Sequence, residues 1–221
     1  MNLLTPLFDV YKLSIYTFLV SLILDLTICL PTTKKYMKNN TQLYIDNLHA
    51  NLKNLFILSP IYYFFAYNIL LDNSIQKFSI LNTYVLLFVQ NIFYHYAHQY
   101  MHIIPNIRWI HDFHHKYTET TPTIGNAVTM SEFQIAYILP FLIGSFIVNP
   151  SPLDLQTAIF IISTLNMFIH SQELKEIKYF DYLVSPKKHI GHHETRSGTY
   201  SAPLFDLDKI FKMDFLKKSY E

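Results

Sequence analysis

Residues 133–172 read FQIAYILPFLIGSFIVNPSPLDLQTAIFIISTLNMFIHSQ and carry one formal charge, at Asp154. The segment NPSP at 149–152 is a turn signal that divides this stretch into two apolar runs, 133–153 and 155–172. Each run is long enough to cross a hydrocarbon core of about 30 Å as a helix, which rises about 1.5 Å per residue. The stretch therefore predicts a transmembrane helical hairpin.

Three further apolar runs precede this hairpin, at 13–30, 54–71 and 78–101. The last two contain no formal charge, and the short link 72–77 predicts that they form another hairpin. Residues 41–53 alternate polar and apolar side chains and predict an amphipathic helix at the bilayer surface. The sequence thus predicts an all-α fold, an integral membrane helical bundle of about four to five transmembrane helices with a cytosolic, histidine-rich helical cap.

Asp25 is the single charge in the first apolar run. An ionisable residue within a membrane segment indicates a functional site. A carboxylate at the membrane boundary, paired with Lys12 or Lys34, is the simpler interpretation, and the sequence leaves both open.

The composition excludes several classes of protein. Of 221 residues, 51% are hydrophobic and only 15% are charged, which is unlike an ordinary soluble domain. An aromatic content of 16% excludes a disordered chain, and 17 basic against 16 acidic residues disfavour a nucleic-acid binder. The single cysteine, Cys29, cannot form an internal disulfide.

Lysine and arginine residues concentrate in three segments, 34–53, 108–116 and 175–218. Because cytosolic segments carry an excess of these residues, we expect the segments 95–130 and 170–221 to lie on the cytosolic face. The amino terminus and both hairpin turns then lie on the opposite side. This topology gathers ten of the eleven histidines on one side of the membrane.

Histidine is unusually abundant, with 11 residues in 221. His98 and His102 are four residues apart, the pattern H-x-x-H-H occurs at 111–115 and again at 189–193, and His170 closes the last apolar run. At this frequency of histidine the pattern is expected by chance roughly 0.03 times in the chain. Residues at i, i+3 and i+4 share one face of a helix, so each group can present two or three imidazoles toward one point.

A single histidine on an apolar face is more often a core residue than a metal ligand. Nine neutral imidazoles that converge at a membrane boundary, however, would leave buried ring nitrogens unpaired at about 1–3 kcal/mol each, which bound metal avoids. Four ligands complete a structural zinc site, whereas eight or nine suffice for two ions of open coordination, so the count favours paired catalytic metals. The predicted ligands are His98, His102, His111, His114, His115, His170, His189, His192 and His193.

These motifs resemble those of the fatty acid hydroxylase/sterol desaturase superfamily of membrane non-haem di-iron oxygenases. The resemblance runs from about residue 91 to residue 213, and its order and spacing match around an intervening membrane hairpin. The motifs are HQYMH at 98–102, PNIRWIHDFHH at 105–115, HS at 170–171, PKKHIGHH at 186–193 and LDKIF at 207–211.

The resemblance implies two iron ions held by the histidines, with O2 used to hydroxylate, desaturate or oxidise a C–H bond of a lipid, either a fatty acyl chain or a sterol. It also implies electrons from NAD(P)H delivered through a reductase or cytochrome b5, and a membrane of the endoplasmic reticulum type if the cell is eukaryotic. Residues 81–221 would form the di-iron domain, as one structural unit. Residues 1–80 would supply transmembrane and amphipathic helices.

The chain departs from the family pattern at three positions. Gln99 replaces an arginine usual in the first motif, and Asn91 replaces an aspartate, so neutral amides stand where the family has an ion pair next to the metal ligands. His95 stands where an aromatic residue is usual and is a possible additional ligand by its spacing. Glu132 occupies a position that is often acidic in the family, where it either bonds to an imidazole or serves as a helix-start carboxylate.

Two other functions remain open. A membrane zinc-dependent lipid hydrolase would use three histidines and a carboxylate to activate water, although the number of histidines counts against it. A catalytically inactive metal-binding relic that shapes membranes or assists a partner enzyme is compatible with the replacements at Gln99 and Asn91.

Overall fold

The computed structural model describes residues 4–75 and 77–211, and the secondary structure of this part is helical apart from one isolated bridge between Leu183 and Phe205. The prediction of an all-α fold is therefore confirmed. The longer helices are α1 (Leu4–Leu26), α2 (Leu30–Asn39), α3 (Thr41–Lys53), α4 (Ser59–Ile69), α5 (Ile80–Ile103), α8 (Leu139–Val148), α9 (Pro152–Ile169) and α10 (Pro186–Thr195). The short helices are α6 (Trp109–Asp112), α7 (Met130–Glu132) and α11 (Leu207–Ile210), the 3-10 turns η2 (Pro105–Ile107), η3 (His114–Lys116), η4 (Pro122–Asn126) and η6 (Gln172–Leu174), and the π-helices η1 (Asn54–Leu58) and η5 (Phe133–Ile138).

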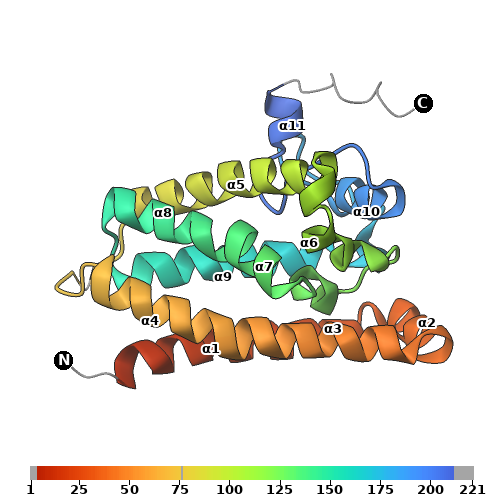
Figure 1. Ribbon diagram of the computed structural model, residues 1–221, viewed down its shortest axis with the longest axis horizontal. Helices are drawn as coiled ribbons and strands as arrows, with labels where there is room; N and C mark the ends of the chain where they lie inside the picture. Colours follow the sequence, from red (N-terminus) through yellow and green to blue (C-terminus); the bar gives the residue numbers. More distant parts are fainter. Residues whose placement is uncertain (1–3, 76, 212–221) are drawn as a thin grey trace.

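The long helices lie side by side along the longest axis of the molecule (Figure 1). Both turns that join the predicted hairpins lie at one end, together with the start of α1, and α6 and α10 lie at the opposite end. We call these the turn end and the histidine end. A core of buried apolar residues that includes Leu86, Ala66 and Ile162 packs the helices together near the turn end.

Three helical segments of the described chain are long and apolar enough to cross a membrane: Leu4–Leu26, Met130–Val148 and Pro152–Ile169. Our estimate of four to five also counted the runs 54–71 and 78–101. The first of these is helical only from 54 to 69, and the second, α5, carries a buried polar side that includes Gln90, Asn91 and three histidines.

The two turns are tied to each other by hydrogen bonds. Ser151 and Asp154 form a capping box at the start of α9, and Asn149 ends α8 in the left-handed conformation with φ 43°. The Asp154 carboxylate also accepts from the backbone N–H of Ser79 at 2.7 Å, and the N–H of Asp72 donates to the carbonyl of Pro150 at 3.0 Å. Asp154, the only charged residue in 133–172, therefore joins the turn of one hairpin to the turn of the other.

Helix α3 has the predicted bounds, but its polar side faces the protein. Asn47 and Asn51 are fully buried, whereas Ile45 and Leu52 are exposed. Asn51 donates to the carbonyl of Thr123 at 2.8 Å. The alternating pattern therefore reflects a helix that buries amides and exposes apolar side chains such as Ile45 and Leu52. Its buried side meets backbone groups of η4, the 3-10 helix that contains Thr123, and bonds to them.

Asp25 pairs with neither Lys12 nor Lys34, which corrects the simpler interpretation. Lys12 lies 3.4 Å from Asp9 one turn earlier in α1. The fully buried Asp25 carboxylate instead accepts from three hydroxyls and one backbone N–H. Its partners belong to α3 and to the segment 121–123, so Asp25 joins α1 to the histidine end.

Candidate metal centre

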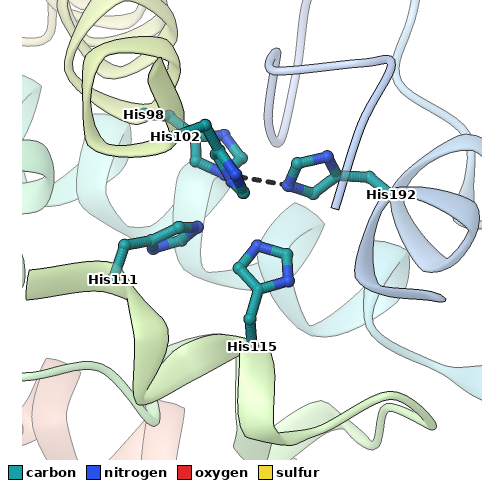
Figure 2. Close-up of side chains that lie close together, drawn as sticks. All are labelled: His98, His102, His111, His115 and His192. Carbon is teal, nitrogen blue, oxygen red and sulfur yellow. Dashed lines mark hydrogen bonds between the residues drawn. The ribbon is translucent and has the colours of Figure 1, made fainter. Parts of the chain in front are cut away.

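Five histidine rings from three parts of the chain point toward a common centre at the histidine end (Figure 2). One ring nitrogen of each lies within 4.8 Å of those of the others, and all five residues are buried. Helix α5 supplies two rings, the α6–η3 segment two and α10 one. We call this group the five-histidine cluster: His98, His102, His111, His115 and His192.

Four other histidines form an adjacent group by the same distance criterion, and they too are buried. The two groups are in contact, since the ring centroids of His115 and His193 are 4.8 Å apart and those of His111 and His114 are 5.3 Å apart. The four-histidine cluster consists of His114, His170, His189 and His193.

Each H-x-x-H-H motif is divided between the two clusters in the same way. Its first and last histidines, which are four residues apart, enter one cluster. The middle histidine points to the other cluster. The motif at 111–115 thus gives two rings to the five-histidine cluster, and the motif at 189–193 gives two to the four-histidine cluster. Two sets of candidate ligands are therefore built from one repeated pattern.

Five rings use their Nδ1 atoms to bind oxygens outside the clusters. A carbonyl oxygen can only accept, so Nδ1 must carry the proton, and the lone pair of Nε2 is then free for a metal. These bonds join His98 to Tyr200 O (2.7 Å), His111 to Glu132 Oε1 (2.6 Å), His114 to Ala127 O (3.3 Å), His170 to Asn166 O (2.8 Å) and His193 to Tyr117 O (2.9 Å).

The inward-facing nitrogens fit a cation. The Nε2 atoms of His114 and His170 are 3.4 Å apart. Because both rings carry their proton on Nδ1, the two Nε2 lone pairs face each other and repel unless a positive ion lies between them. The buried Nε2 atoms of His111 and His193 have no hydrogen-bond partner in the described chain. Such unpaired groups are costly to bury, and a metal ion would satisfy them.

Burial keeps the rings neutral, which is the form that binds metals. Desolvation lowers the pKa of His114 to about 4, and desolvation together with the neighbouring His114 lowers the pKa of His170 to about 3. The pKa values of His115 and His189 are lowered by the same two causes, burial first and adjacent imidazoles second. A second proton on any of these rings is therefore strongly disfavoured at neutral pH.

Glu132 lies against the five-histidine cluster. Its Oε1 atom is 2.6 Å from Nδ1 of His111, and the carboxylate is fully buried. The residue also begins a helix, because its backbone N–H donates to the Thr129 hydroxyl at 3.1 Å. Glu132 therefore fits both interpretations from the sequence, because it contacts an imidazole and also lies in the first turn of a helix. A carboxylate in this position orients the imidazole and makes Nε2 a stronger ligand.

The other three predicted neighbours of the centre do not contact its rings in this way. Asn91 accepts from the backbone N–H groups of Leu204 and Phe205, at 3.3 and 3.1 Å. Gln99 is buried, with no hydrogen bond to a histidine in the described residues. His95 belongs to neither cluster, and its Nδ1 lies 3.1 Å from the Ser201 hydroxyl.

Sequence reasoning missed the groups that orient four of the nine rings, because they are backbone carbonyls. Tyr117, Ala127, Asn166 and Tyr200 act through main-chain oxygens that no residue type reveals. One signal was available in Gly125. A Cβ atom there would lie 2.8 Å from Asn166 Nδ2 and 3.3 Å from Nδ1 of His170. With only four glycines in the chain, a glycine between two histidine motifs indicates close packing.

Comparison with protein families identifies the family to which the chain belongs. Residues 83–213, more than half of the chain, match the fatty acid hydroxylase family. The chain therefore belongs to the fatty acid hydroxylase family, within the fatty acid hydroxylase/sterol desaturase superfamily. No curated protein and no solved structure matched it. The family domain and the paired histidine clusters together fit a lipid-modifying oxygenase.

Proposed function

We propose that this protein is a membrane-bound non-haem di-iron oxygenase that oxidises a C–H bond of a lipid in lipid biosynthesis. For a hydroxylation, the lipid, O2, two electrons and two protons would give the hydroxylated lipid and water. For a desaturation, the same inputs would give a double bond and two waters. The observation that carries the proposal is the pair of adjacent histidine clusters whose Nε2 lone pairs face inward.

The donor set favours iron over a zinc hydrolase. Both clusters consist of histidine alone, and neither contains a carboxylate or thiolate ligand. Two bound irons would supply O2 activation and electron transfer, which zinc cannot supply. The protein would hold them in a fixed array of neutral imidazoles, and Glu132 would set the strength of one ligand through His111. Burial of all nine rings would keep water away from the oxidant.

Metal analysis tests the first step of the proposal. Protein purified in detergent should contain about two irons per chain. His192→Ala should abolish O2-dependent lipid oxidation while the protein stays in the membrane, whereas His49→Ala, an exposed position on α3, should leave it unchanged. One zinc per chain with no O2 consumption would favour the hydrolase instead, and two irons without turnover would favour the inactive relic.

Lipid profiling identifies the reaction. Membranes from cells with and without the protein are compared after growth under 18O2. A hydroxylated lipid that carries one 18O atom defines a hydroxylase, and a new double bond without 18O defines a desaturase. An oxygen that comes from water in a cleaved lipid would support the zinc hydrolase.

We also propose that the histidine end faces the cytosol and receives electrons from NAD(P)H through a reductase or cytochrome b5. The support is the position of the basic residues, which include Lys116 and Lys187 near the histidine motifs. The only cysteine, Cys29, is fully buried, so a membrane-impermeant maleimide reports on introduced cysteines. In sealed microsomes Lys187→Cys should be labelled and Asn73→Cys, in a hairpin turn, should be protected; the reverse pattern would invert the topology.

A further inference from the structure

A cavity of about 110 Å³ lies inside the helical bundle, on the membrane side of the metal centre. Its walls come from α1, η1, α4, η4, η5, α8 and α9. Val10, Ala66 and Leu155 line it toward the turn end, where α1 and α9 begin (Figure 1). Asn126 and Tyr137 line it toward the histidine end. The cavity therefore runs along the bundle in the direction that a lipid chain takes in a bilayer.

Both π-helices of the described chain contribute to this cavity. Leu55 of η1 lines one wall, and Phe133, Tyr137 and Ile138 of η5 line another. Single π-helical turns inside longer helices widen the backbone and occur frequently at functional sites, because they cost stability and persist when the altered side-chain directions are useful. That both fall on one cavity indicates that its shape is specified by the sequence.

The histidine end of the cavity adjoins the four-histidine cluster. The Tyr137 hydroxyl donates to the Gly125 carbonyl at 2.9 Å, and Asn126 is the next residue. On the other side of Gly125, a Cβ atom would lie 3.3 Å from Nδ1 of His170. The 3-10 segment η4 therefore borders both the cavity, through Asn126, and the four-histidine cluster, through Gly125, so a molecule at this end of the cavity would lie close to a predicted ligand.

The cavity is apolar along its length and polar at one end. Several hydroxyls in its walls already have protein partners: Ser14 donates to the carbonyl of Leu55 at 2.6 Å, and Tyr63 accepts from Gln156 at 2.9 Å. Asn126 differs, because its buried Nδ2 has no hydrogen-bond partner in the described residues. Rotation about Cβ–Cγ would present either half of this amide to an oxygen of a ligand.

The size of the cavity selects among lipids. A cavity of about 150 Å³ holds one benzene ring, so about 110 Å³ fits a few methylene groups better than a fused four-ring nucleus. A linear chain can continue beyond the cavity into the bilayer. A lipid seated here would have its polar end near Asn126 and its hydrocarbon toward Ala66, as its surroundings in a bilayer would also orient it.

We propose that this cavity binds a single linear acyl or alkyl chain of the lipid substrate, with an oxygen of its carbonyl or hydroxyl group hydrogen-bonded to the Asn126 amide. The identity of the occupant as the substrate rests on the proposed function. The site itself rests on the cavity, the two π-helices and the unpaired amide. The proposal also gives helices α1 and α4, which lie outside the matched family region, a direct part in substrate selection.

Photo-crosslinking tests the site without requiring turnover. Metal-loaded protein in detergent is irradiated with hexadecanol that carries a diazirine near the hydroxyl, and the adducts are mapped by mass spectrometry. We expect labelling of the peptide that contains η5, and little labelling there by a diazirine sterol. Ala66→Leu, which fills the cavity, should reduce the η5 adduct at least five-fold, whereas Asn68→Leu, exposed on the same helix, should not. Asn126→Ala should weaken labelling while the metal content is unchanged.

Equal η5 labelling in Ala66→Leu and wild type, or equal labelling by the sterol, would overturn the inference. If Ala66→Leu does not fold, Ser163→Leu in the α9 wall makes the same test from the opposite side. The readout also separates the two proposals. Chain binding without any O2-dependent product would refute the oxygenase and leave the site, whereas oxidation with labelling only at outward residues such as Ile61 would refute the site and leave the oxygenase.

Discussion

Replacement of Asp25 should destabilise the protein more than replacement of any other carboxylate in its N-terminal helices. The carboxylate lies within 2.6 Å of the Thr123 hydroxyl, 3.0 Å of the Thr121 hydroxyl, 3.1 Å of the Tyr44 hydroxyl and 3.1 Å of the Thr123 N–H. It is fully buried. In Asp25→Leu these four donors lose their acceptor together.

The magnitude follows from the donors that cannot find another partner. The two threonine hydroxyls are 3.3 Å apart and can bond to each other, but this bond uses only one of their two protons. The other hydroxyl proton, the Thr123 N–H and the Tyr44 hydroxyl then have no acceptor. A buried donor without a partner costs about 1–3 kcal/mol, so Asp25→Leu should lower the free energy of unfolding by about 6 kcal/mol. At roughly 2–4 °C per kcal/mol for a chain of this length, the Tm should fall by roughly 12–24 °C.

Thermal unfolding in one detergent provides the assay, with metal content measured on the same samples. Asp25→Asn should lose less than Asp25→Leu, because an amide oxygen can still accept from the Thr123 N–H and hydroxyls can turn to accept from its N–H2. Asp46→Leu, whose carboxylate accepts from the exposed Gln42 on α3, is the control and should change stability by no more than about 0.5 kcal/mol. A Tm for Asp25→Leu equal to that of this control would refute the reasoning.

The remaining predictions concern the metal centre. Gly125→Ala should reduce bound metal, because its Cβ would clash with Asn166 Nδ2 at 2.8 Å, whereas Gly191→Ala, with no atom within 4 Å, should not; metal per chain decides. Glu132→Gln should weaken metal affinity by about 10–100-fold in chelator competition, since His111 loses a charged acceptor. The metal-free protein should gain stability as pH rises from about 4 to about 6.5, and its stability should level off above that range. Burial lowers the pKa of His114 to about 4, whereas histidine in the unfolded chain has a pKa near 6.5, so the unfolded state binds more protons between these two values. Measurement of Tm as a function of pH tests this.

The convergence of the histidines could be predicted because helix periodicity places residues four apart on one face. His189 and His193 of α10 meet in one cluster for this reason, and His111 and His115 also meet although the chain passes from α6 to the 3-10 turn η3 between them. The division into two clusters could not, because the position of the middle histidine of each motif depends on how α10 faces the α6–η3 segment. That arrangement is set by tertiary bonds, such as the one from His193 to the carbonyl of Tyr117.

The predicted count of about four to five spans exceeds the three helical segments that are long and apolar enough to cross a membrane, and α5 accounts for part of the difference. A count of apolar residues treats α5 as a spanning helix, but the same helix must place His98 and His102 in the centre and Asn91 against the segment 204–205. Its polar residues serve the interior of the protein. The mean hydropathy of a stretch of sequence does not show whether its polar residues face the protein interior or the lipid, because burial depends on neighbours that are distant in the sequence.

The N-terminal helices hold the metal centre in place as well as anchoring the bundle. The segment 121–128 consists of the short 3-10 helix η4 and irregular residues on both sides of it, so part of its buried backbone needs partners from elsewhere. Asn54 supplies them to the carbonyls of Asn126 and Val128, at 3.2 and 3.0 Å, and Asp25 supplies one to the Thr123 N–H. The same segment accepts from His114 through the carbonyl of Ala127. Helices outside the matched family region therefore bond to one side of this segment, and its other side orients a candidate ligand. The geometry of the candidate site in the family domain thus depends on the N-terminal helices of the same chain.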